Sequence, residues 1–167
     1  IGYTGTTFSV ASQDAAPMGI TWDGTHLWVV GTTTDSVYKY TSAGVYTGTS
    51  FSVGSQDTDP RGITWDGTHF WVVGTSTDSV YKYTSAGVYT GTSFSPSQAA
   101  SPEDIVWDGT HFWVLSRSLD TVYKYSSAGT YQSVSFYVGA HVLDPYGITW
   151  DGTDFWLLDK STDSVYK

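Results

Sequence analysis

The chain has 167 residues, which is enough for one domain with a hydrophobic core; 17% are aromatic and only 14% are charged. Its formal net charge of −9 disfavours nucleic-acid phosphates and anionic membrane surfaces as partners, and no apolar run is long enough for membrane insertion. With no Cys in the sequence, disulfides, thiolate metal ligands and a thiol nucleophile are excluded.

A repeat of about 43 residues runs through the whole chain. Trp22, Trp65, Trp107 and Trp150 are separated by 43, 42 and 43 residues, and each is followed by Asp-Gly-Thr. Residues 19–52 and 62–95 differ at only two positions. This near-identity indicates recent duplication or deliberate construction, and it predicts one shared structure for all copies.

The copy at 62–95 predicts four strands, at 62–65, 70–73, 79–83 and 88–94. Asp66-Gly67 between the first two is a signal for a two-residue type I′ hairpin turn. The second strand, Phe-Trp-Val-Val, has no polar face, so both of its faces are expected to be covered. The fourth strand is more polar, as expected at an outer position.

A four-stranded antiparallel unit of this length with a covered second strand is typical of a β-propeller blade. We therefore predict an all-β fold, a single four-bladed β-propeller over residues 1–167, with blades at 19–53, 62–95, 104–138 and 147–167 plus 1–10. Residues 2–10 match the fourth strand and the C-terminal copy stops within its third strand. The N-terminal strand is thus expected to complete the C-terminal blade and close the ring. The runner-up is an eight-bladed ring in which two chains exchange that strand.

The motif Gly-Ile-Thr-Trp-Asp-Gly-Thr-His-Phe-Trp-Val-Val, followed by Val-Tyr-Lys-Tyr-Thr-Ser-Ala-Gly, resembles the repeats of the NHL/YVTN propeller superfamily. It is also similar to blades of streptogramin-lyase-like and glutamine-cyclotransferase-like propellers. The resemblance covers the chain blade by blade and implies the propeller fold. Those relatives generally have more than four blades, and no position matches their catalytic residues.

Several repeated side chains suit a structural role better than a chemical one. The Asp of each Asp-Gly pair is expected to set its turn. The Trp of each second strand is expected in the core. His26, His69 and His111 fall on different blades, too far apart to share one metal ion, so no metal site is predicted. The Lys of each third strand lies between tyrosines or close to them and is expected to solvate one face or to stack on aromatic rings; these residues are Lys39, Lys82, Lys124 and Lys167.

If the chain binds a ligand, the site is expected where the copies differ, in the second turns and in the long loops before the first strands, which share one face of a propeller; drift in unconstrained loops is the alternative explanation of these differences. The ligand-binding candidates on this face are Arg61, Arg117, His141 and Lys160. The Trp residues that end the first strands, Trp22, Trp65, Trp107 and Trp150, are candidates at a rim or a seam between blades. An enzyme would need an asymmetric set of groups, for which the non-repeated charges are the nearest candidates: Glu103, Asp104, Arg117, His141, Asp159 and Lys160.

These patterns favour a non-catalytic binding module on a secreted or surface protein, with a glycan or a protein as partner. A structural or engineered repeat scaffold without a ligand is the alternative, and a lyase- or cyclotransferase-like enzyme is the second alternative. No catalytic residues and no cofactor are predicted, apart from a single ion or waters in the central channel. A monomer is expected, with the strand-exchanged dimer as the alternative.

Overall fold

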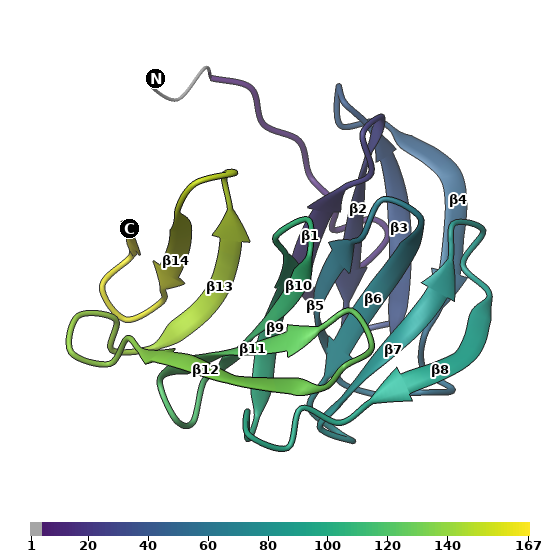
Figure 1. Cartoon of the computed structure of the whole chain (residues 1–167). Helices are drawn as coiled ribbons and strands as arrows, with labels where there is room; N and C mark the ends of the chain where they lie inside the picture. Colours follow the sequence, from purple (N-terminus) through teal and green to yellow (C-terminus); the bar gives the residue numbers. More distant parts are fainter. Residues whose placement is uncertain (1–4) are drawn as a thin grey trace.

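The computed structural model describes residues 5–167 and shows an all-β chain in which no helix occurs among these residues (Figure 1). Fifteen strands form four antiparallel sheets, each built from strands that follow one another in the sequence. The first two blades contain β1 (Pro17–Trp22), β2 (His26–Gly31), β3 (Ser36–Thr41), β4 (Tyr46–Ser52), β5 (Pro60–Trp65), β6 (His69–Gly74), β7 (Ser79–Thr84) and β8 (Tyr89–Phe94). The other two contain β9 (Pro102–Trp107), β10 (His111–Ser116), β11 (Thr121–Ser126), β12 (Tyr131–Tyr137), β13 (Pro145–Trp150), β14 (Phe155–Asp159) and β15 (Ser164–Tyr166).

The four sheets are the blades of a propeller, which confirms the predicted fold class and blade count. The innermost strands β1, β5, β9 and β13 pack side by side in that order. The four strands expected in the repeat at 62–95 are all present, with ends within two residues of the predicted ones. Because the copies are nearly identical, the same strand register recurs: Trp65 pairs with Phe70 in the second blade as Trp107 pairs with Phe112 in the third.

The hairpin at Asp66 differs from the expected type I′ turn. Asp66 and His69 flank a loop of Gly67 and Thr68, and only Gly67, at φ +97°, has left-handed backbone. The Asp66 carboxylate instead accepts hydrogen bonds from the backbone N–H groups of Thr68 and His69, at 2.8 and 2.7 Å. It also accepts one from Trp71 Nε1 at 2.7 Å, so the turn is tied to the second strand through a side chain.

The core lies in the seams between blades, where the Trp of one second strand packs against the Phe of the next. The ring centroids are 4.6 Å apart for Trp28 and Phe70, and 4.7 Å apart for Trp71 and Phe112. Trp113 and Phe155 repeat the contact at 4.8 Å. The expectation that the second-strand Trp residues belong to the core is confirmed for these three seams, in which each Trp is buried. It is wrong for Trp156 of the fourth blade, which is only partly buried because no following blade packs on it.

The expected closure by the N-terminal strand is not formed in this structure. The fourth sheet has three strands, β13 to β15, and no strand is assigned to residues 5–10; residues 1–4 of the predicted strand lie outside the described part. Phe8 nevertheless packs on Tyr40 of the first blade, with ring centroids 5.7 Å apart. Counting repeats predicts how many blades there are, whereas closure depends on the angle between blades, which is set by seam packing.

Candidate functional site

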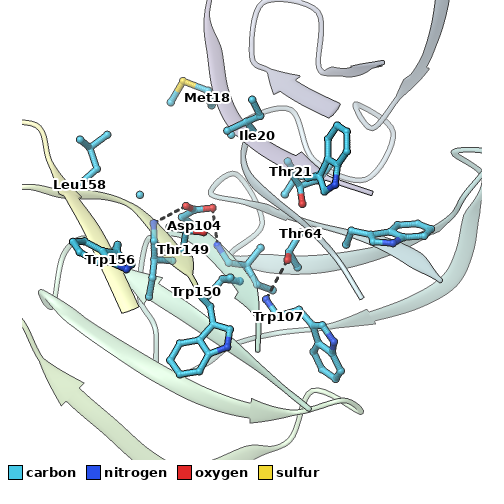
Figure 2. A pocket seen from close by; sticks show the side chains of 18 of the residues that line it. Met18, Ile20, Thr21, Thr64, Asp104, Trp107, Thr149, Trp150, Trp156 and Leu158 are labelled. Carbon is cyan, nitrogen blue, oxygen red and sulfur yellow. Dashed lines mark hydrogen bonds between the residues drawn. The ribbon is translucent and has the colours of Figure 1, made fainter. Parts of the chain in front are cut away.

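The innermost strands line a central hollow of about 710 Å³ (Figure 2). Its wall is formed by all four strands, through Ile63, Ile105 and Ile148 among others. Tyr146 lies near the start of its innermost strand and Trp150 at its end, and both line the hollow. Four residues of extended chain span roughly 13 Å, so the two ends of each innermost strand define two separate mouths.

The four rim Trp residues share one mouth. Trp65, Trp107 and Trp150 each pack on the Phe that follows the turn, with ring centroids 4.6 Å apart. Trp22, whose blade has Leu27 in place of that Phe, is 46% exposed. These rings are therefore partly engaged with their own hairpins, and Trp22 presents the largest free surface.

The opposite mouth carries a position that differs in every copy. Met18, Arg61, Glu103 and Tyr146 occupy equivalent places, immediately before the Gly or Asp that enters the innermost strand. The flanking residues are almost constant, so the change is concentrated at this point. This alignment of the copies could have shown the position from sequence alone, because four different residue types stand at one place in otherwise matching repeats.

Tyr146 is the centre of a cluster of charged side chains at this mouth. Arg61 Nη1 lies 3.4 Å from the Tyr146 hydroxyl, to which it donates a hydrogen bond. The Arg117 guanidinium lies 5.1 Å and Lys160 Nζ 4.5 Å from the centroid of the Tyr146 ring, within the range of cation–π attraction. Three of the predicted binding residues from three blades thus meet on one side chain that the prediction had not included.

Carboxylates pair with both guanidinium groups. Arg61 donates to Asp59 at 2.8 Å and lies 3.5 Å from Glu103, while Arg117 Nε donates to Asp144 at 2.7 Å. Arg61, Glu103, Arg117 and Asp144 line a cavity of about 420 Å³, a volume in the range of small-ligand sites.

Burial acts to raise the pKa values of the Glu103 and Asp59 carboxyl groups, whereas the neighbouring positive charges act to lower them. Burial raises the pKa of Glu103, which is only 4% exposed, although the Arg61 and Arg117 charges oppose the shift. Burial also disfavours ionisation of Asp59, but the hydrogen bonds from Arg61 and Thr75 and the Arg61 charge hold its pKa below the ordinary value. Arg61 Nε and Glu103 Oε1 are buried without a hydrogen-bond partner, a state that costs roughly 1–3 kcal/mol per group.

Asp104 brings a further carboxylate into the wall of the hollow, where the other three blades have Gly. It accepts hydrogen bonds at 2.8 Å from its neighbour Ile105 N and from Ile148 N of the next blade (Figure 2). Burial raises the pKa of Asp104 to about 7, against the effect of these two hydrogen bonds. A carboxyl group that titrates near neutral pH can act as a proton donor or acceptor.

The remaining predicted residues lie elsewhere. His141 is exposed and borders a separate hollow lined by Trp113, Phe136 and Lys167, so it does not join the Tyr146 cluster. The three repeated His residues stay on their own hairpins; Nδ1 of His69, for example, lies 2.8 Å from the Thr68 hydroxyl. Among residues 5–167, no group of three or more His, Cys, Asp or Glu side chains has an arrangement that could hold a metal ion.

Asp159, a candidate for a catalytic role, lies in a buried position where its carboxylate stabilises the backbone. It is fully buried and accepts hydrogen bonds from Leu143 N at 2.7 Å and Ser161 N at 2.8 Å. Burial opposes its ionisation, yet these bonds hold the pKa of Asp159 below its ordinary value. In the second blade Asp57, which lies in the loop before the first strand, has the equivalent role. It accepts hydrogen bonds from Asp59 N at 2.8 Å and Thr77 N at 3.0 Å.

The buried carboxylate comes from the loop before the first strand in the second blade and from the end of the second strand in the fourth blade. Where Asp57 is present the facing residue is Gly74, on which an added Cβ would clash with the Asp57 carboxylate. In the fourth blade the equivalent residues are Val142 and Asp159, so the acid and the small residue are not in their original places. The paired change at these two aligned positions is a signal of the exchange that single repeats do not carry.

Comparisons with solved structures place this geometry among larger propellers. The four blades superpose on virginiamycin B lyase from Staphylococcus aureus with a TM-score of 0.63 and 22% identity, covering 89% of this chain and 50% of that one. Glutaminyl cyclase from Myxococcus xanthus matches at 0.62 with 8% identity over 84% and 60% of the two chains. A chain of a nidogen/laminin complex matches at 0.62 with 12% identity over 89% and 74%.

These likenesses show the propeller fold. They include enzymes and a chain from a protein–protein complex, so they do not separate catalysis from binding. The chain spans about half the length of the lyase structures that it matches. No protein-family model and no curated protein matches the sequence. No helix among the described residues is long and apolar enough to cross a membrane.

Proposed function

We propose that this propeller is a binding module that recognises a glycan at the mouth surrounded by Arg61, Glu103, Arg117, Asp144 and Tyr146. The observation that carries the proposal is the convergence of non-repeated charged side chains from three blades on Tyr146, beside a cavity of about 420 Å³.

The chemistry of the cluster suits a polyhydroxylated ligand. Carboxylates accept and guanidinium groups donate hydrogen bonds, and a sugar hydroxyl does both, so adjacent Asp and Arg side chains can bind the same sugar. The cations and carboxylates nearly balance here, which favours an uncharged glycan over a strongly anionic one. Arg61 Nε and Glu103 Oε1 are buried without a hydrogen bond, although the two side chains form an ion pair, so this arrangement is not optimised for stability alone.

Glycan-array screening followed by titration calorimetry tests the proposal. Tyr146→Met and Arg61→Met place at each site the residue that the first blade carries there, so both variants should fold. We expect each to weaken binding at least tenfold, since each removes contacts at the centre of the cluster. Trp22→Ala, at the other mouth, is the matched control and should leave binding unchanged. Loss of binding only in Trp22→Ala would move the site to the Trp mouth, and failure of any glycan to bind would refute the proposal.

A second candidate function is acid–base catalysis of the lyase type, favoured by the pKa of about 7 at Asp104 beside the same mouth. Quinupristin, named in one of the matched lyase structures, is a suitable first substrate. Turnover whose rate changes with a midpoint near pH 7, and which is lost in Asp104→Gly, would support catalysis. Saturable binding without turnover would favour the binding module.

A further inference from the structure

The two ends of the blade array expose apolar faces that are buried in every internal seam. Ile20 is 59% exposed, whereas its counterpart Ile63 is 2% exposed. On the other end, Leu158 and Val165 are 45% and 61% exposed, although the equivalent Leu115 and Val122 of the third blade are fully buried. Each end therefore exposes one side of a seam between blades. The apolar residues that form the other side of such a seam are exposed at the opposite end of the chain.

The first blade already bears the outer strand of a blade that is missing. Phe8 packs on Tyr40 as Phe51 of the first blade packs on Tyr83 of the second, with centroid distances of 5.7 and 5.4 Å. Gly5 has the same φ of +82° as Gly48 in β4. Residues 5–10 thus have features of an outer strand, and they lie where such a strand meets the next blade, but their own sheet is absent.

The fourth blade has the complementary deficiency. Its sheet ends at β15 and lacks an outer strand among the described residues. In the first and third blades the carbonyl oxygens of Asp35 and Asp120 each accept a hydrogen bond at 2.8 Å, from Val53 N and Val138 N. Asp163 is the equivalent residue and has the same left-handed backbone, with φ +51° against +49° at Asp35. Its carbonyl is therefore positioned to accept from Val10 N of a docked strand.

We propose that the occupant of both faces is a second copy of this chain, so that two chains form one closed ring of eight blades. Residues 5–10 of each copy would complete the β13–β15 sheet of the other, and Trp156, Leu158 and Val165 would pack on Ile20 and Leu27. Two equivalent seams form at once, because the arrangement is a two-fold symmetric exchange.

The geometry of the seams favours a second copy over closure within one chain. The three internal seams have nearly equal Trp–Phe distances of 4.6 to 4.8 Å, and with these seams formed β13 does not pack along β1 as the other innermost strands pack along one another. Closing four blades on themselves would have to change the angle at those seams.

A disulfide between paired strand positions tests the exchange directly, since the chain contains no Cys. Ser36 pairs with Ser52 in the first blade, so Ser164 should pair with Ser9 of the partner. Opposed residues of antiparallel strands are close enough for a disulfide. We expect oxidised Ser9→Cys/Ser164→Cys to run as a covalent dimer on a non-reducing gel. A disulfide within one chain would show closure in cis and overturn the proposal, as would no disulfide or a ladder of longer species.

Light scattering of the full chain should give twice the chain mass of 18.2 kDa. Ile20→Glu and Leu158→Glu each damage one face and should each be folded monomers, because both residues are exposed in the single chain. Mixed in equal amounts, they should regain the dimer mass, since one undamaged seam remains. Val88→Glu, which is equally exposed but far from both faces, is the control and should stay dimeric. A monomeric parent chain, or no recovery on mixing, would refute the assembly.

Discussion

Replacing Asp23 with Asn removes the charge that ties the first hairpin to the core. The Asp23 carboxylate accepts from Thr25 N and His26 N at 2.7 Å, and from Trp28 Nε1 at 2.6 Å. Asn keeps one acceptor oxygen but presents an N–H₂ group to Trp28, whose indole N–H then loses its partner. We expect a loss of stability at neutral pH with little change in the fold.

The size of the expected loss of stability follows from the shift in the pKa of Asp23. Burial opposes ionisation, but the hydrogen bonds from Trp28, Thr25 and His26 lower the pKa of Asp23 from 3.8 to about 2. At roughly 1.4 kcal/mol per unit, the ionised group contributes about 2 kcal/mol to the free energy of unfolding. Because the folded pKa is depressed, this contribution is complete above pH 4 and is lost as the pH falls through about 2.

Urea unfolding of the parent chain and of Asp23→Asn at pH 7 and at pH 2 measures this contribution. The difference in the free energy of unfolding between the two proteins should be about 2 kcal/mol at pH 7 and should nearly vanish at pH 2. Asp35→Asn is the control, because burial and the neighbouring charge of Asp57 raise the pKa of Asp35; it should be neutral or stabilising at pH 7. A difference for Asp23→Asn that is zero at pH 7, or equal at both pH values, would refute the reasoning.

Three further predictions concern the seams, the exchanged carboxylate and the hollow. In the monomeric Leu158→Glu background, Phe70→Ala should lower the free energy of unfolding by about 3–5 kcal/mol, whereas Leu27→Ala, at the same repeat position on the open end, should cost less in denaturant titrations; equal losses would contradict the seam account. Asp159→Gly should lower the melting temperature, and adding Val142→Asp should restore most of the loss by recreating the arrangement of the second blade; no rescue would show that the two positions are not coupled. Asp104→Gly should gain stability relative to the parent as the pH rises from about 4 to about 7, because a raised carboxyl pKa penalises ionisation in the folded state; a constant difference in melting temperature between pH 4.5 and pH 8 would count against this.

The blades could be predicted from sequence because each is specified locally. The hairpin residues, the apolar run Phe70 to Val73 and the spacing of the Trp residues all favour the same strands, and four copies repeat the signal. The error at Asp66 has a local cause as well: the dipeptide suggested positive φ at both residues, but the carboxylate serves as an acceptor for the turn and for Trp71.

The candidate site was predicted only in part. Arg61, Arg117 and Lys160 were recognised as non-repeated charges, but Tyr146, on which they meet, is an aromatic residue in an aromatic-rich chain and did not stand out. His141 has the same sequence signal as the arginines, yet its loop carries it away from the cluster. Which loop residues converge depends on the angle between neighbouring blades around the axis. The sequence of a single repeat does not predict that angle.

The seam chemistry has a consequence for how this chain can change in length. Trp28, Trp71 and Trp113 meet the same kind of aromatic partner, so these seam contacts do not by themselves fix the order of the blades. Gain or loss of one whole copy would leave the same two terminal surfaces on display. Recombination can therefore change the number of blades in such a sequence without requiring a new kind of contact between blades.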